Sequence, residues 1–209
     1  MADLQVIADA VERGDRDLAV QTVSDALAEG MTPGQILDEA LIAGMTSIGV
    51  KFKNNEVFIP EVLIAARAMA GAMDILEPKL VESGVEPRGK VVIGTVKQDL
   101  HDIGKNLVAM MLKGGGFKVV DLGVDVAPEA FVEAAKTEGV QVVALSALLT
   151  TTMPNMKAVV DALKRAAVTD VKVMIGGAPV TQAFADEIGA AGYAPDAGSA
   201  VDLVTELIQ

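Results

Sequence analysis

From residue 90 to its end, the sequence alternates short β-branched runs with segments of helical periodicity. Helices with connections this short return the chain to the same edge of a sheet, so consecutive strands run parallel. We expect strands at Lys90–Thr95, Val119–Leu122, Val140–Ser146, Lys172–Ile175 and Gly192–Tyr193, with helices at Ile103–Leu112, Pro128–Lys136, Pro154–Ala166, Thr181–Ile188 and Ser199–Ile208. The sequence therefore predicts an α/β fold with a doubly wound, parallel, five-stranded sheet.

The residues before this segment show helical spacing of apolar side chains throughout. Thr32 followed by Pro33 is typical of a helix start, and Pro60 opens a further helix, which Pro78 must bend or end early. Four helices with short connections predict a small bundle. Because the linker 82–90 is rich in glycine, proline and charge, we expect a helical cap domain over residues 1–86 and an α/β domain over 87–209.

The charge balance limits the partners of this chain. The formal net charge is -12 and the isoelectric point is near 4.5, so nucleic acids and anionic membranes would repel the protein. No apolar run approaches the roughly 18 residues that span a bilayer, and the first residues lack the features of a signal peptide. We therefore expect a cytoplasmic protein that binds neither nucleic acid nor membrane.

His101 is the single histidine among 209 residues, and the chain has no cysteine. A zinc site needs three or four protein ligands, which one imidazole does not supply. A metal that is already held in a macrocycle needs only an axial ligand from the protein, and a histidine oriented by a carboxylate can supply it. The alternative interpretation of His101 beside an aspartate is a solvated loop pair without a ligand.

Three motifs in register decide between these interpretations. The first motif is Asp99-Leu-His101-Asp-Ile-Gly104. After 41 intervening residues comes Ser146-Ala-Leu148, and after 27 more comes Gly176-Gly177. This pattern resembles the cobalamin-binding motifs of corrinoid methyltransferase proteins, methionine synthase and carbon-skeleton mutases. In a doubly wound sheet all three motifs follow strand ends, at the edge where ligands bind.

The resemblance implies a role for each motif residue. His101 is expected to be the lower axial ligand of the cobalt, with Asp99 accepting the other imidazole N–H and Thr152 extending this relay. Gly104 would allow close approach of the corrin. The tail of the cofactor would occupy a slot lined by small residues, with hydrogen bonds from the side chains of Ser146 and Thr150. The small residues expected to line this slot are Gly94, Ser146, Gly176, Gly177 and Ala178. Leu148 is a further expected cofactor-binding residue.

The N-terminal part carries a further resemblance. Gly44-Met45, Ile48-Gly49, Phe52 and the run Glu56–Glu61 are similar to the helical cap that precedes the cobalamin domain in methionine synthase and in small corrinoid proteins. Such a cap covers the cofactor as a movable lid. Phe58 matches the aromatic residue that shelters the upper face of the cofactor in relatives.

The resemblance implies a corrinoid protein of an anaerobic methyltransferase system, of the methylamine, betaine or methoxyaromatic type. Such a protein accepts a methyl group on cob(I)alamin from a substrate-specific methyltransferase. It passes the group to a second methyltransferase that serves tetrahydrofolate or coenzyme M, and a reductive activator restores oxidised cofactor. We expect a carrier subunit without a catalytic residue of its own. Two alternatives remain: a cobalamin-dependent sensor, and a flavodoxin-like interaction module without cofactor.

Overall fold

The computed structural model describes residues 3–209, which form two compact units. The first unit contains the described residues up to Arg88 together with the turn at 113–116. The second contains Gly89–Leu112 and Phe117–Gln209. Each unit has its own buried core and is described by itself. Among the described residues, no helix combines the length and apolar character that crossing a bilayer requires.

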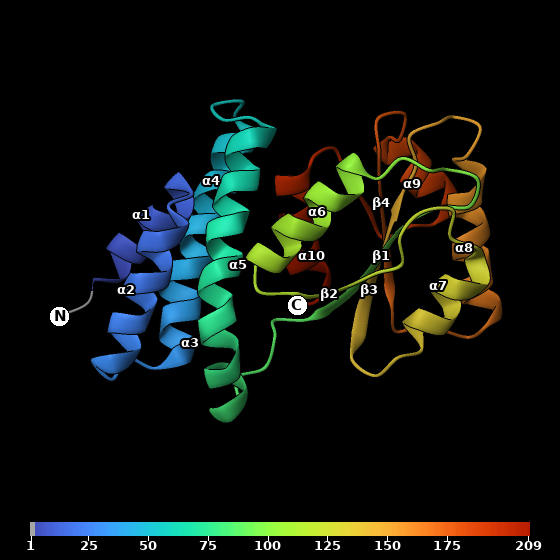
Figure 1. Ribbon diagram of the computed structural model, residues 1–209. Coiled ribbons are helices and arrows are strands. Elements are labelled where there is room, and N and C mark those ends of the chain that lie inside the picture. Colours follow the sequence, from blue (N-terminus) through green and yellow to red (C-terminus); the bar gives the residue numbers. More distant parts are fainter. Residues whose placement is uncertain (1–2) are drawn as a thin grey trace. The chain divides into compact units, whose positions relative to one another are not determined.

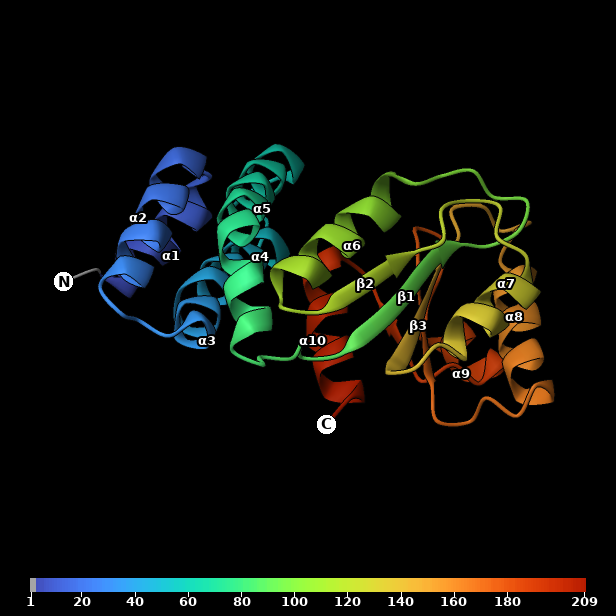
Figure 2. The ribbon, with the colours of Figure 1, turned by 60° about the horizontal axis from the view of Figure 1, so that its bottom comes forward.

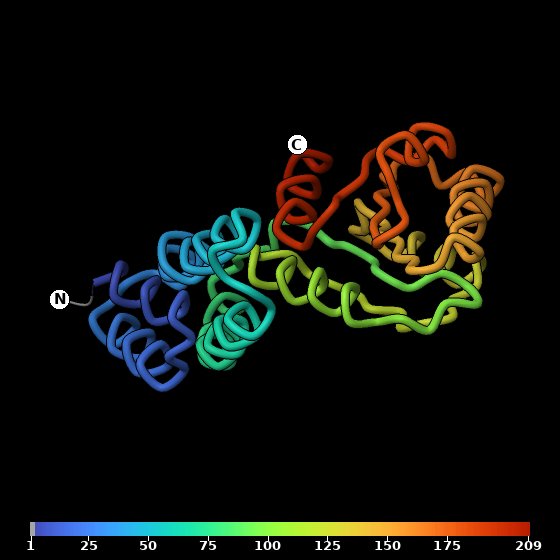
Figure 3. The backbone as a smooth tube through the Cα atoms, turned by 90° about the horizontal axis from the view of Figure 1, so that it is seen from above, coloured from blue at the N-terminus to red at the C-terminus, as the bar shows by residue number. Residues whose placement is uncertain are grey.

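The first unit is a bundle of helices, visible end-on in Figure 3. It contains α1 (Leu4–Arg13), α2 (Arg16–Ala28), α3 (Pro33–Ile36), the π-helical segment η1 (Leu37–Ile42), α4 (Ala43–Lys53) and α5 (Ile59–Glu82). The segments α3, η1 and α4 follow one another without a break, so the bundle has the four expected helical stretches. The side chain of Thr32 caps the third stretch by accepting a hydrogen bond from the Gln35 N–H.

Helix α5 does not end at Pro78 but continues through it to Glu82. Proline has no N–H to donate to the carbonyl four residues earlier, which is that of Asp74. Both Asp74 and Pro78 are exposed, so water can hydrate the freed carbonyl. An exposed position therefore lets the helix keep a proline that a buried position would not tolerate.

The second unit is built on a five-stranded parallel sheet in the order β2-β1-β3-β4-β5. The strands are β1 (Lys90–Thr95), β2 (Lys118–Asp121), β3 (Val140–Ser146), β4 (Lys172–Gly176) and β5 (Gly192–Ala194). Figure 2 shows β2, β1 and β3 side by side. The predicted doubly wound fold is confirmed, and each strand differs from its expected range by at most one residue at either end.

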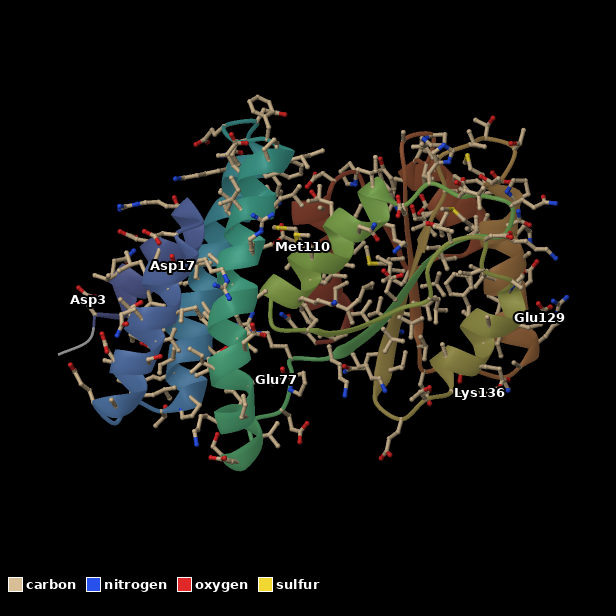
Figure 4. The ribbon with its side chains drawn as sticks, in the orientation of Figure 1. Asp3, Asp17, Glu77, Met110, Glu129 and Lys136 are labelled. Atoms are coloured by element: carbon tan, nitrogen blue, oxygen red, sulfur yellow. The ribbon has the colours of Figure 1, made fainter. Side chains whose placement is uncertain are left out.

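Helices cover both faces of this sheet (Figure 1). On one face α6 (Ile103–Gly114) and α10 (Ala197–Leu207) pack against the sheet through Ala109, Leu112, Ala200 and Val204. The opposite face is covered by α7 (Pro128–Ala135), α8 (Pro154–Arg165) and α9 (Gln182–Ile188), with Phe131 as the largest fully buried side chain. The charged residues Glu129 and Lys136 at the ends of α7 point away from the sheet (Figure 4).

The strand order reverses between β1 and β3. From β1 the chain leaves to α6 on one face, whereas from β3 it leaves to α8 on the other. The two loops therefore diverge at the carboxyl edge and leave room between them for a ligand. The register places Thr95, Ser146 and Gly176 side by side at this edge.

Candidate functional site

Asp99 lies at the centre of the carboxyl edge and is completely buried, with 0% of its side chain exposed. Its Oδ1 accepts hydrogen bonds from the His101 ring Nδ1 at 2.7 Å and from the His101 backbone N–H at 3.1 Å. Its Oδ2 accepts bonds from the Leu148 N–H at 2.8 Å and from the Thr152 hydroxyl at 2.6 Å. The carboxylate thus joins the loop after β1 to the loop after β3.

These donors control the ionisation of Asp99. Burial alone would raise the pKa of this carboxyl, because the charged form loses its hydration. The hydrogen bonds from Thr152, from the Leu148 N–H and from His101 outweigh burial and hold the pKa of Asp99 far below its usual range. Asp99 is therefore an anion at neutral pH.

His101 is oriented by this anion. An ionised carboxylate only accepts hydrogen bonds, so the imidazole Nδ1 must donate. In the neutral ring the proton then sits on Nδ1, and Nε2 keeps a free lone pair. The side chain is 49% exposed and its Nδ1 is bonded to Asp99, so part of the ring is accessible to a ligand.

The protein itself offers no complete metal site around this imidazole. Across residues 3–209 no group of three or more histidine, cysteine, aspartate or glutamate side chains is placed to hold a metal ion. A metal bound by His101 would have to bring its other ligands with it, as a metal in a macrocycle does.

The backbone of the histidine loop is held by neighbouring elements. The buried Thr95 hydroxyl donates to the His101 carbonyl at 2.8 Å, and the Asn155 side-chain amide donates to the Lys97 carbonyl at 2.7 Å. The sequence prediction missed both residues. Thr95 carries a readable signal, since a polar residue ends an otherwise apolar buried strand at the ligand-binding edge.

Asp125, in the loop after β2, is a third support that the sequence prediction missed. Its Oδ1 accepts the Gln98 N–H at 2.7 Å, and its own N–H donates to the Asp99 carbonyl at 2.9 Å. Gln98 and Asp125 both have left-handed backbone, with φ of 67° and 53°. Only the register of β2 beside β1 brings these residues together.

Ser146 at the end of β3 and Gly176 at the end of β4 lie side by side on the face of the sheet that α6 and α10 cover, and Gly177 follows directly. These residues form a row of small side chains. A Cβ on Gly176 would meet only the Ala194 carbonyl, at 3.1 Å. Gly177 has φ of 130°, and a Cβ there would lie 1.9 Å from the Ala147 carbonyl oxygen, so only glycine fits. This row of small side chains suits the predicted slot.

Gly94 does not belong to this slot, contrary to the sequence prediction. Its side-chain position faces the opposite side of the sheet, where a Cβ would lie 2.8 Å from the Phe131 ring. Side chains alternate between faces along a strand, and Gly94 directly precedes Thr95 in β1. The small size of Gly94 makes room for Phe131.

Exposed apolar side chains flank the histidine. Leu100 and Ile103 are 72% and 74% exposed, and Leu148 and Leu149 are partly exposed on the loop after β3. A Cβ on Gly104, in the first turn of α6, would meet no atom within 4 Å, so internal packing does not explain this glycine. A partly exposed imidazole, an apolar surround and open space above Gly104 together fit an apolar macrocycle with an axial position to fill.

Lys105 is buried. Its ammonium donates to the Asp121 carboxylate at 2.5 Å and to the Asn106 side-chain oxygen at 2.7 Å. Asp121 ends β2, so this ion pair joins the first turn of α6 to the neighbouring strand. The Asp102 carboxylate accepts a hydrogen bond from the Asn106 side-chain amide at 3.1 Å.

Thr150 and Phe58 are the remaining predicted residues. Thr150 is exposed on the loop after β3, two residues before Thr152. Phe58 belongs to the helical unit, where it precedes α5 and donates its N–H to the Glu61 carboxylate at 3.0 Å. Val62, Ala65 and Met69 are buried in that unit, whereas the Phe58 ring is exposed.

Comparisons with known proteins agree with this geometry. Two family models described as B12 binding domain match residues 89–202 and 4–77. Trimethylamine corrinoid protein 1 of Methanosarcina acetivorans is 45% identical over 202 residues, which are 95% of this chain and 92% of that protein.

Two solved structures are also similar. A cobalamin-binding protein from Desulfitobacterium hafniense has a TM-score of 0.84 and 33% identity, over 99% of both chains. The methanol:cobalamin methyltransferase complex of Methanosarcina barkeri contains a chain with a TM-score of 0.86 and 31% identity, over 98% of this chain and 79% of that one.

Proposed function

This chain belongs to the B12 binding domain family, and from that premise we propose that it is a corrinoid methyl carrier working between two methyltransferases. Family membership gives cobalamin as the cofactor. Relatives named as trimethylamine corrinoid proteins, and a similar chain within a methanol:cobalamin methyltransferase complex, support the carrier role over that of a sensor.

The observation that carries the proposal is the hydrogen bond between Asp99 and His101. A carboxylate that accepts the Nδ1–H fixes the ring and raises the basicity of Nε2. His101 is the residue that would bind the cobalt. Bound cobalamin supplies a metal centre that accepts and releases methyl groups.

Other residues of the edge would hold the rest of the cofactor. The row of small residues at Ser146, Gly176 and Gly177 would take the tail, with hydrogen bonds from the hydroxyls of Ser146 and Thr150. Gly104 and Leu148 would lie against the macrocycle. Phe58 as a shelter for the upper axial position stays a prediction, as does the domain boundary at residue 86.

The partners follow from the carrier role. A substrate-specific methyltransferase would charge the protein, and the complex named above supports a partner of that kind. A second methyltransferase serving tetrahydrofolate or coenzyme M would discharge it, and a reductive activator would restore oxidised cofactor. The protein contributes binding, orientation and selective docking rather than a catalytic residue. Cytoplasmic location stays a prediction from the sequence.

The test is a discharge experiment with the cobalamin-loaded protein. Protein charged with a radiolabelled methyl group should not react with tetrahydrofolate or coenzyme M alone. Adding the cognate second methyltransferase should release one labelled methyl group per protein, while heat-inactivated methyltransferase serves as the control. Multiple-turnover demethylation of a donor by the isolated protein would contradict the carrier role.

A further inference from the structure

We propose that Asp125 is a positioning residue that holds Asp99, and through it His101, in the orientation that leaves Nε2 free. The importance of a free Nε2 rests on the proposed function. The positioning itself concerns only residues of this chain and can be measured without a cofactor.

Asp125 bonds to the histidine loop on both sides of the peptide that joins Gln98 to Asp99. Its carboxylate accepts the Gln98 N–H at 2.7 Å, and its backbone N–H donates to the Asp99 carbonyl at 2.9 Å. One bond with Asp125 as acceptor and one with Asp125 as donor fix both the position and the rotation of this stretch. The contact is not a local turn, because 27 residues separate Gln98 from Asp125.

The backbone conformations of Gln98 and Asp125 are unfavourable and need hydrogen bonds to stabilise them. Gln98 and Asp125 have φ of 67° and 53°, a region that residues with a Cβ seldom occupy. Aspartate is among the side chains that tolerate this conformation, whereas glutamine has no such preference. The hydrogen bond to Asp125 therefore compensates for the unfavourable backbone of Gln98, one residue before Asp99.

The two supports of Asp99 act on different parts of the residue. Its carboxylate is held by donors from the loop after β3, namely the Leu148 N–H and the Thr152 hydroxyl. Its main chain is held from the loop after β2 by Asp125. Without the Asp125 carboxylate the Gln98 N–H loses its acceptor, and only the backbone bond from Asp125 to the Asp99 carbonyl remains. The main chain at Asp99 can then turn, and the Asp99 carboxylate meets the His101 ring less often.

The experiment uses the full-length apo protein in two samples. One is labelled with ¹⁵N-histidine, in which His101 gives one pair of ring nitrogen signals, and the other is uniformly labelled with ¹⁵N to record the Gln98 amide. Two-bond proton–nitrogen couplings report which ring nitrogen carries the proton in the neutral form. Wild type should show the Nδ1–H tautomer. Asp125→Gly removes the carboxylate and relieves the left-handed backbone, so the ratio of Nδ1–H to Nε2–H should fall by about fivefold to tenfold, the equivalent of one lost hydrogen bond.

Two further variants complete the comparison. Asp125→Asn keeps an acceptor oxygen and tolerates the backbone, so it should retain the wild-type tautomer while the Gln98 amide proton moves upfield, because a neutral acceptor replaces a charged one. Asp170→Gly removes an exposed carboxylate elsewhere in the same unit and should change neither signal. The Asn variant keeps the proposal testable even if the Gly variant does not fold.

The outcomes separate the two proposals. An unchanged tautomer ratio in folded Asp125→Gly, or an unmoved Gln98 amide in Asp125→Asn, would overturn the positioning role whatever the cofactor does. The expected changes in the apo protein would support the positioning role of Asp125 even if the wild-type protein did not bind cobalamin. A failure to bind cobalamin would count only against the proposed function.

Discussion

Thr152→Val tests how much the buried carboxylate depends on its donors. Valine has nearly the shape of threonine but no hydroxyl, so the change removes the 2.6 Å bond to Asp99 together with the 2.9 Å contact of the same hydroxyl with the Leu149 carbonyl. Asp99 is fully buried, so water does not replace the missing donor. A hydrogen bond to a charged group is worth about 1.5–3 kcal/mol, and the free energy of unfolding at pH 7 should fall by about that amount.

The pH dependence gives the sign of the effect. A carboxylate whose folded-state pKa lies below its unfolded value stabilises the fold above the unfolded pKa, and this stability is lost as pH falls through the folded pKa. Without the hydroxyl, the folded-state pKa of Asp99 rises toward its ordinary range. The variant therefore takes up its proton at higher pH than wild type, and the stability difference narrows as pH falls below about 4.

The assay is urea denaturation of the wild type and of Thr152→Val between pH 7 and pH 3, with unfolding monitored by circular dichroism. Thr151→Val is the matched control, because Thr151 is exposed and its change should stay within about 0.5 kcal/mol of wild type. An equal loss in both variants, or a Thr152→Val difference that does not narrow at low pH, would refute the assignment of Thr152 as a donor to an ionised Asp99.

Three other changes have expected outcomes. Gly177→Ala would place a Cβ 1.9 Å from a carbonyl oxygen, so the free energy of unfolding measured in urea should fall by about 3 kcal/mol or more. In the control Gly139→Ala, where φ is 81° and no atom lies within 4 Å, it should fall by about 1–2 kcal/mol, and equal losses would mean that the packing around Gly177 is wrongly described. Gly104→Leu should leave the stability of the apo protein within about 1 kcal/mol and weaken cobalamin retention in equilibrium dialysis, since open space surrounds this position; undiminished retention would place the corrin elsewhere. Asp99→Asn should shift the cobalt midpoint potential in a spectroelectrochemical titration, because the basicity of His101 falls; an unaltered potential would mean that the two side chains are not coupled.

The sequence predicted the sheet and its edge well because local signals and chain topology agree there. β-Branched runs end at polar or small residues such as Thr95, Ser146 and Gly176, and parallel topology brings those ends together. The sequence left open whether Pro78 bends or ends its helix, because sequence alone does not show which side of a helix faces water.

The sequence predicted only those site residues that lie in a motif or match a position of the related proteins. Asp99 and His101 belong to the first motif, Thr152 was expected from the resemblance, and the structure places the three in hydrogen-bonding contact. Asp125 was not predictable, because its contact depends on the register of β2 beside β1 and on two left-handed residues meeting.

The face of a single small residue was also difficult to predict. Gly94 looked like part of the slot, but strand alternation turns it toward Phe131. The pairing of Lys105 with Asp121 likewise depends on neighbouring elements that the local sequence does not reveal. Burial of a charged side chain is decided by its partner, not by its position in a helix turn.

The most direct test of the central proposal is electron paramagnetic resonance of the protein loaded with cob(II)alamin. His101 is the single histidine, so labelling the protein with ¹⁵N-histidine labels one candidate ligand. If His101 binds cobalt, the nitrogen splitting should change from a triplet to a doublet on labelling, and His101→Ala should lose the protein-derived splitting. A splitting that ignores the protein label and responds only to ¹⁵N in the cofactor tail would contradict His101 as the cobalt ligand.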